Sequence, residues 1–144
     1  DYHRIHMPIA GKLLRMVHVP GQLYSVNPAT ARGVPGLFAR NERLSCLFDG
    51  PDGAFASIMV GAMIVAGIDT VWPHRFAGHV KAPVREDFAQ GAVDLAAGAE
   101  MGRFYLGSTV VLLFEPGRVE WLGGITAGDP VRMGQAIGTR LSAG

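Results

Sequence analysis

The sequence has a single cysteine, Cys46, among its 144 residues. One thiol cannot form an intramolecular disulfide, so a disulfide-stapled scaffold and a multi-cysteine zinc site are both excluded. Charge is also scarce, because charged residues make up 17% of the chain and the formal net charge is +1. Nucleic-acid binding depends on clustered Lys and Arg, whereas the 13 basic residues here are scattered. We therefore expect no nucleic-acid partner.

Long apolar runs are missing as well. The most apolar stretch, Ala54 to Ile68, is shorter than the roughly 20 residues that span a bilayer and contains two glycines, Gly61 and Gly67. We interpret it as buried sheet. The chain begins at Asp1 rather than at Met, so we expect a fragment of a longer protein whose targeting or anchoring segment lies upstream.

Glycine and proline, in contrast, are frequent, with 20 and 9 residues. They divide the chain into short apolar runs, which is typical of many short strands and tight turns. The length fits one domain, residues 1–144. We predict a compact, mainly β domain, a mixed sheet or barrel-like, with short helices. The predicted strands are Lys12 to Val19, Leu44 to Phe48, two pieces within Ala54 to Val71, Thr109 to Phe114 and Val119 to Leu122.

The rest of the chain shows less regular patterns. Helical spacing runs from about Ala29 to Asn41 and is interrupted by Pro35. His74 to Gln90 has mixed charge and few β-branched residues, which predicts a long connecting loop. His18 and Cys46 lie in predicted strands, so we interpret both as structural.

Two segments, Pro8 to Leu23 and Gly128 to Gln135, resemble the turn and strand pattern of biotinyl/lipoyl-like hybrid β folds. A carrier domain of that kind presents a lysine at a hairpin tip. The two lysines, Lys12 and Lys81, do not lie in such a motif.

The most reactive combination is a Gly107-Ser108 pair directly before the apolar, predicted buried strand Thr109 to Phe114. Glycine permits strained backbone and a close approach of the serine hydroxyl to the preceding carbonyl carbon. An ordinary turn has the same pattern, so a reactive serine also requires a second residue that can accept its proton. His3 and His6 are candidates, because imidazole titrates near neutrality. They could also be a surface pair, and we expect no metal site because no cysteine or patterned carboxylate accompanies them.

Five segments in order resemble the phosphatidylserine decarboxylase family, of the bacterial membrane-associated type. The resemblance extends over essentially the whole chain. The segments are Asp1 to Pro8, Tyr24 to Pro28, Leu37 to Arg43, Gly102 to Phe114 and Val131 to Gln135.

The resemblance implies a self-processing proenzyme that decarboxylates phosphatidylserine to phosphatidylethanolamine and CO2. In the family, the serine hydroxyl attacks the preceding carbonyl and β-elimination turns the serine into a pyruvoyl cofactor. Here the cut falls between Gly107 and Ser108 and gives chains 1–107 and 108–144, which stay associated. The pyruvoyl ketone forms a Schiff base with the substrate amine, and the adjacent amide carbonyl accepts the electrons that CO2 leaves behind.

The same resemblance assigns roles to both histidines. His6 matches the histidine that activates the serine, and His3 matches the one that serves decarboxylation, as proton donor to the carbanion. The family's histidine-orienting aspartate lies upstream of the Asp-Tyr-His-Arg motif, and no residue here corresponds to it. Whether this fragment alone cleaves itself therefore stays open. Arg40 and Arg43 could bind the phosphate or carboxylate of the head group, or be ordinary salt-bridged surface arginines.

A lipid substrate implies a membrane surface as partner, and we expect a peripheral protein on the cytoplasmic side of the bacterial cell membrane. Homo-oligomerisation is left open. Two other functions also stay open: a pyruvoyl-dependent decarboxylase of another amino lipid or amino acid, and a non-catalytic hybrid-β binding module or unprocessed pseudoenzyme. An interfacial loop or a plain surface loop is expected around Trp72, His74, Arg75, Phe76 and Lys81.

Overall fold

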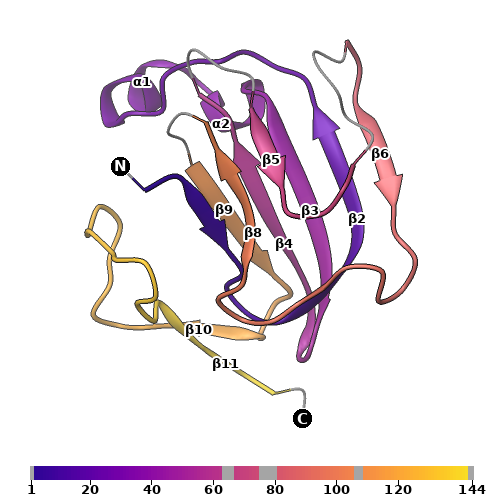
Figure 1. Cartoon of the computed structure of the whole chain (residues 1–144). Coiled ribbons are helices and arrows are strands. Elements are labelled where there is room, and N and C mark those ends of the chain that lie inside the picture. Colours follow the sequence, from indigo (N-terminus) through magenta and orange to yellow (C-terminus); the bar gives the residue numbers. More distant parts are fainter. Residues whose placement is uncertain (1, 63–66, 75–80, 106–108, 143–144) are drawn as a thin grey trace.

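The computed structural model describes residues 2–62, 67–74, 81–105 and 109–142 (Figure 1). Its two short helices are α1 (Pro28–Gly33) and α2 (Leu37–Arg40). The strands are β1 (Arg4–His6), β2 (Gly11–Val19), β3 (Arg43–Gly50), β4 (Gly53–Val60), β5 (Ile68–Thr70), β6 (Val84–Asp87), β7 (Asp94–Leu95), β8 (Glu100–Phe104), β9 (Thr109–Phe114), β10 (Val119–Trp121) and β11 (Gly138–Arg140).

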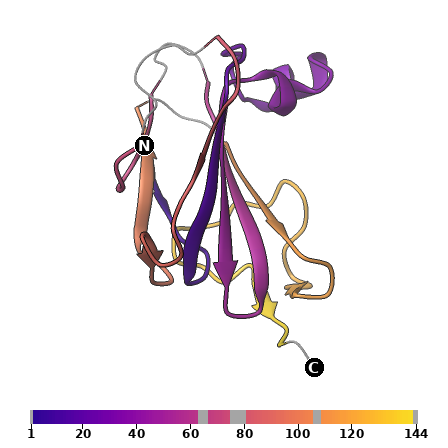
Figure 2. The ribbon, with the colours of Figure 1, turned by 90° about the vertical axis from the view of Figure 1, so that its right-hand side faces the viewer.

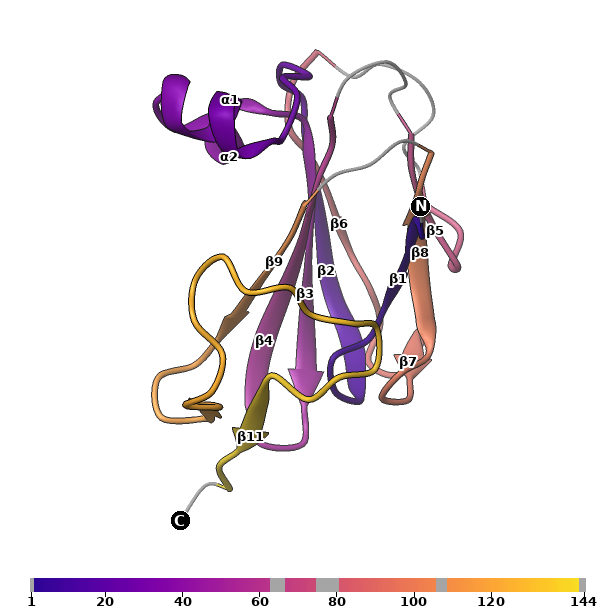
Figure 3. The same cartoon turned by 90° about the vertical axis from the view of Figure 1, so that its left-hand side faces the viewer.

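These strands form two facing sheets and a separate pair. The large sheet has the order β6-β2-β3-β4-β9, with β7 added to β2, and the small sheet has the order β1-β8-β5. Strands β10 and β11 pair with one another. Figure 2 shows the two sheets edge-on. Figure 3 shows the β10–β11 pair at the opposite end of the large sheet from α1 and α2.

The centre of the large sheet follows from strict alternation of side chains along β3. Leu44, Cys46 and Phe48 are buried, and the residues between them are half-buried. Alternate residues of a strand point to opposite faces, so this pattern turns one face of the sheet toward a core. Gly53, with φ of 125°, supplies the left-handed residue that closes the tight turn between β3 and β4.

An aromatic cluster fills the space between the two sheets. The rings of Phe48 and Phe55 stack with centroids 5.2 Å apart, and Trp72 meets Phe48 edge-on at 6.3 Å. Met101 and Phe104 of the small sheet belong to the same buried cluster. The hydrophobic contact fixes the small sheet over the inner face of the large one.

Asn41 joins the helical region to the sheet. Its side chain is fully buried, accepts a hydrogen bond from the Tyr24 amide at 3.0 Å, and donates to the carbonyls of Tyr24 and Gly61 at 2.8 and 2.9 Å. Helix α1 begins after Asn27, whose side chain accepts from the Thr30 amide at 2.9 Å. The two helices thus lie at the end of the large sheet where β3 begins and β4 ends.

The mainly β prediction is confirmed, with two short helices within the helical segment interrupted at Pro35. Each predicted strand is present, and Ala54 to Val71 contributes β4 and β5. Of the two arrangements expected, the structure shows open sheets, and the described residues form no closed barrel. The large sheet ends at β6 on one side and at β9 on the other.

Two expectations about irregular regions were wrong. The predicted loop from His74 to Gln90 contains β6, which pairs with β2 in the register Arg15↔Asp87. The two side chains of that pair form an ion pair at 2.7 Å. An edge strand can be this polar because one side faces solvent. In the second case, Gly128 to Gln135 forms turns and no strand, so its likeness to a hybrid-β repeat does not extend to the structure.

Neither helix in the described ranges is long and apolar enough to cross a membrane.

The buried position of Asn41 leads to a stability prediction. Asn41→Ala leaves three backbone groups without their partner, and we expect the free energy of unfolding to fall by about 2–4 kcal/mol. Asn27→Ala is the matched control, since loss of an exposed N-cap costs about 1 kcal/mol. Urea unfolding of both variants measures the difference. Equal losses would show that Asn41 does not hold the helical region to the sheet.

Candidate active site

The expected cleavage site lies between strands of different sheets. Gly107 and Ser108 are outside the described residues, but their flanks are described. Phe104, at the end of β8, pairs with Ile68 in the small sheet, and Thr109, at the start of β9, pairs with Val60 in the large sheet. The chain therefore passes from one sheet to the other across this junction.

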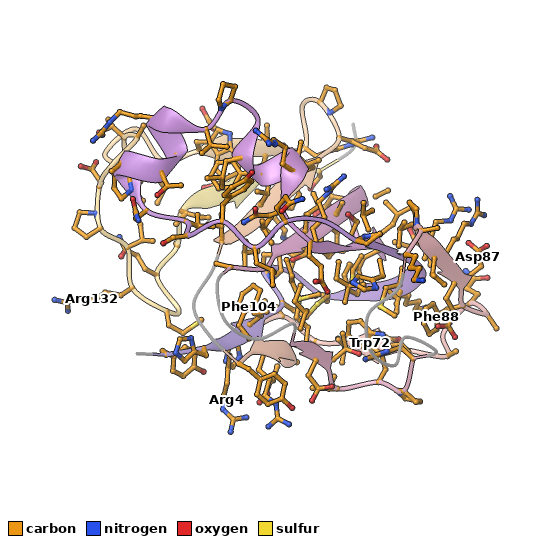
Figure 4. The ribbon with its side chains drawn as sticks, turned by 90° about the horizontal axis from the view of Figure 1, so that it is seen from above. Arg4, Trp72, Asp87, Phe88, Phe104 and Arg132 are labelled. Atoms are coloured by element: carbon orange, nitrogen blue, oxygen red, sulfur yellow. The ribbon has the colours of Figure 1, made fainter. Side chains whose placement is uncertain are left out.

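His3 lies next to the end of β8. Its carbonyl accepts a hydrogen bond from the Phe104 amide at 2.9 Å, so its backbone is fixed close to the residue that precedes the junction. Along β1, burial alternates so that His3 and Ile5 share one face while Arg4 is exposed on the other. Figure 4 shows the same division, with Phe104 pointing toward the large sheet and Arg4 pointing away. His3 is thus on the inner face of the small sheet.

His6 lies on the opposite face of β1, together with Tyr2 and Arg4. Its ring stacks on Tyr2, with centroids 5.8 Å apart and an interplanar angle of 18°. Its Nδ1 is 2.7 Å from the Gly98 carbonyl oxygen, and its Nε2 is 2.5 Å from the Tyr2 hydroxyl. The sequence brought both histidines into one motif, but the fold separates their side chains by the thickness of a sheet.

The two candidate anion-binding arginines differ in what they contact. Arg43 pairs with Val60, which pairs in turn with Thr109, so Arg43 lies two strands away from the junction in one row of the sheet. Its Nη1 donates to the carbonyls of Ala39 and Asn41 at 2.7 and 3.1 Å. This arginine stabilises the end of α2.

Arg40 is exposed on α2. Its Nη2 donates to the Tyr24 hydroxyl at 3.1 Å, and its guanidinium lies over the Tyr24 ring at 5.2 Å. Stacking of this kind pre-orients a guanidinium while its other N–H groups face solvent.

The expected interfacial loop is not one surface feature. Trp72 is 4% exposed and belongs to the core, so its assignment to an interfacial or plain surface loop was wrong. Lys81 is exposed and His74 is half-buried, and Arg75 and Phe76 lie outside the described residues. His18 and Cys46 do lie in strands, and burial raises the pKa of the Cys46 thiol well above its usual value. No group of three or more metal-binding side chains occurs in the part of the chain described by the structure.

The segment after the junction is attached through several contacts. Strand β9 pairs with β4 along its whole length. The centroid of the Phe114 ring is 5.8 Å from that of Phe55 and 6.1 Å from that of Trp121. Arg140 forms an ion pair with Asp52 at 3.1 Å. The expected burial of this strand is only partial, because β9 is the edge of the sheet and Leu113 is 55% exposed.

Other charged groups on the small sheet are already paired. Arg103 contacts Asp69 at 3.0 Å, and this hydrogen bond raises the pKa of Arg103. Arg4 contacts Glu100 at 2.5 Å. Opposite charges therefore neutralise each other across neighbouring strands of this face. Sequence reasoning missed Tyr2, Gly98 and Asn41, although the alternation along a strand could have placed Tyr2 on the same face as His6.

The comparisons with known proteins agree on one family. The sequence profile of the phosphatidylserine decarboxylase family matches residues 1–139. The chain belongs to the phosphatidylserine decarboxylase family.

Similar proteins are bacterial phosphatidylserine decarboxylase proenzymes. That of Pseudomonas fluorescens strain Pf-5 is 53% identical over 148 residues, covering 98% of this chain and 50% of the relative. That of Ectopseudomonas mendocina is 54% identical over 145 residues, covering 96% and 49%. That of Bordetella pertussis is 57% identical over 140 residues, covering 95% and 47%. The chain spans about half the length of the curated relatives it matches.

The attachment of β9 can be tested with two neighbouring residues. Phe114→Ala removes contacts to two aromatic rings, and we expect a loss of about 2–3 kcal/mol in the free energy of unfolding. Leu113→Ala, on the exposed face of the same strand, should cost less than about 0.5 kcal/mol. Denaturant unfolding compares them. A larger effect at Leu113 would contradict the arrangement of β9 described above.

Proposed function

We propose that this chain carries the reactive site of a pyruvoyl-dependent phosphatidylserine decarboxylase, which converts phosphatidylserine to phosphatidylethanolamine and CO2. Family membership supports the reaction. The main support for the location of the site is the place of Gly107-Ser108 in the chain. They fall between Tyr105 and Thr109, where β8 of the small sheet is followed by β9 of the large sheet. Beside this junction, the His3 carbonyl accepts a hydrogen bond from the Phe104 amide.

The proposed first reaction is self-cleavage between Gly107 and Ser108. The Ser108 hydroxyl oxygen attacks the Gly107 carbonyl carbon, its proton passes to His6, and breakage of the C–N bond leaves an ester and a free amino group. Loss of the Ser108 Cα proton then expels the Gly107 carboxylate. The resulting dehydroalanine exchanges its nitrogen for a water oxygen and releases ammonia, which leaves a pyruvoyl group.

The packing supports the expectation that the two cleaved chains stay together. Chain 108–144 contains β9, β10 and β11, and β9 is hydrogen-bonded along β4 of chain 1–107. The Phe114 to Phe55 contact and the Arg140 to Asp52 ion pair cross the same boundary. No covalent connection is needed for these contacts, so each chain is the other's partner.

The residues at the junction fit the proposed cofactor. The pyruvoyl group would be attached to the Thr109 amide nitrogen, and Thr109 is held in register with Val60 at the start of β9. Such a group supplies the electron sink when a carboxylate leaves as CO2. We assign to His3 the delivery of a proton to the substrate carbon, because its backbone is fixed beside the junction on the inner face of the small sheet.

Head-group binding is assigned to Arg40, with Arg43 as a second contact. Arg40 presents a pre-oriented guanidinium at the surface, which suits bidentate binding of a phosphate or carboxylate. Because phosphatidylserine resides in a bilayer, we also propose peripheral association with the cytoplasmic side of the bacterial cell membrane. Exposed Trp121, Val131 and Met133 are apolar side chains that could contact such a surface.

Self-cleavage can be tested on the full-length protein by intact mass spectrometry. We expect two chains, the larger ending at Gly107 and the smaller lighter by one ammonia than a chain beginning with Ser108. Ser108→Ala should remain a single chain, whereas Ser45→Ala, within β3, should process normally. An uncut wild-type protein that is folded would reject self-processing and favour a binding module or a pseudoenzyme.

The two histidines should separate the two reactions. His6→Ala should fail to process because it lacks the proposed base for Ser108. His3→Ala should process but decarboxylate phosphatidylserine about 10²–10⁴ times more slowly, the usual contribution of a general acid. Processing is followed on denaturing gels and CO2 release with labelled phosphatidylserine or free serine. Loss of processing in His3→Ala with normal processing in His6→Ala would show that the two roles are reversed. Faster decarboxylation of free serine than of phosphatidylserine would show that the substrate is the amino acid and not the lipid.

A further inference from the structure

The large sheet ends differently on its two sides. At one edge, β6 carries Arg85, Glu86 and Asp87, and the Asp87 carboxylate is 2.7 Å from Arg15 and 2.8 Å from Arg85. Charged side chains of this kind discourage a further strand from adding to an edge. At the other edge, β9 has the sequence Thr-Val-Val-Leu-Leu-Phe, with no charge and no proline. Within the described residues, β9 pairs with β4 alone.

The hydrophobic core is incomplete on the inner side of β9. The three inner-face residues of β4 are at most 2% exposed, namely Phe55, Ser57 and Met59. Residues directly opposite one another in a strand pair share a face, so their partners on β9 also point inward, namely Phe114, Leu112 and Val110. None of these partners is buried, and Val110 is 39% exposed. Burial thus falls from nearly complete to partial across one strand.

The outer face of β9 needs no such cover. Leu113 is 55% exposed and pairs with Ala56, which is itself only half-buried. An antiparallel sheet commonly has one solvated face, so exposure here is ordinary. Val110, in contrast, lies opposite the fully buried Met59 at the border of the core. The missing contacts are therefore those of the inner face and of the free backbone edge.

A polypeptide strand fits this position, whereas lipid does not. The N–H and C=O groups along the free side of an edge strand are a template for another strand. An added strand would bond to these groups and cover Val110 from the side. Acyl chains have no hydrogen-bonding groups, so a bilayer could cover Val110 but would leave the backbone edge unsatisfied. The chemistry of the edge therefore selects protein as its partner.

A protein of the relatives' size has enough further chain to supply that strand. The curated relatives match this chain over about half of their own length. Strand β1 is also an edge, bonded only to β8 in the described residues. Figure 1 shows β1 and β9 along the same flank of the molecule, and Figure 3 shows them in separate layers. A tethered segment has an effective concentration on the order of millimolar, which favours it over a second copy.

We propose that the free edge of β9 binds a strand from the part of the full-length protein outside residues 1–144. This inference goes beyond the proposed function, because it concerns the packing of the strand after Ser108 and not the reaction. β9 then becomes an internal strand, and Thr109 is held from both sides. After the proposed cleavage, chain 108–144 would be attached to two neighbouring strands instead of one.

Thiol labelling tests whether the inner face of β9 is covered. The full-length Ser108→Ala protein stays uncleaved, and Val110→Cys or Leu113→Cys is added to it. Cys46 is fully buried, so it contributes equally little to both. A covered thiol reacts only when the structure opens locally, so Val110→Cys should react with a maleimide at least about tenfold more slowly than Leu113→Cys. Equal rates would show an open edge and overturn the proposal.

Photo-crosslinking identifies the segment that covers β9. In the same Ser108→Ala protein, p-benzoylphenylalanine replaces Leu113, whose outward side chain would lie within about 5 Å of its neighbour on an added strand. Illumination should give a product of monomer mass on a denaturing gel, with the cross-link at a residue outside 1–144. The matched control places the same amino acid at Arg85 on the charged edge and should give no such cross-link.

The remaining outcomes each overturn the proposal. A product of doubled mass would show that a second copy pairs with β9. A cross-link confined to residues 1–144, or no cross-link, would show that the rest of the protein does not contact this edge. Both measurements use the uncleaved Ser108→Ala protein. A wild-type protein that never cleaves would therefore overturn the proposed function and leave this inference unaffected.

Discussion

The packing of the small sheet on the large one through Phe48, Phe55 and Trp72 is the contact on which the rest of the structure depends. Each ring is buried. Phe48 and Phe55 are cross-strand neighbours in the β3–β4 hairpin of the large sheet, and Trp72 follows β5 of the small sheet. A small sheet of three short strands has little stability by itself. Its position over the large sheet follows from this hydrophobic contact, and so does the position of His6 in β1 and of His3 directly before it.

The same packing explains how a covalent bond at the junction could break without loss of the fold. β8 is secured by β1 and β5 in one sheet, and β9 is secured by β4 in the other. The strand pairings of β8 involve residues up to Phe104, and those of β9 begin at Thr109. A peptide bond there connects two elements that already have their own partners, so its strength is not needed for their arrangement.

The sequence predicted elements with a clear apolar pattern and missed those without one. Thr109 to Phe114 and Lys12 to Val19 were recognisable because apolar residues dominate or alternate in them. β1 has only three residues and two of them are polar, β6 is a charged edge, and β8 contains an irregular register beside Met101. Their strand structure comes from pairing with distant segments, which a local pattern does not contain.

In the candidate site, too, the sequence predicted one part and missed another. Chemistry-bearing side chains can be recognised by type, but the contact from His6 to Gly98 joins residues 92 positions apart, and only the fold creates it. Strand geometry also separates side chains that are close together in the sequence motif. His3 and His6 are three positions apart in an extended chain, so their side chains face opposite sides of the strand. The His6 side chain contacts Tyr2 and Gly98 on the outer face, whereas His3 lies on the inner face, so the two proton transfers proposed above would draw on different imidazoles.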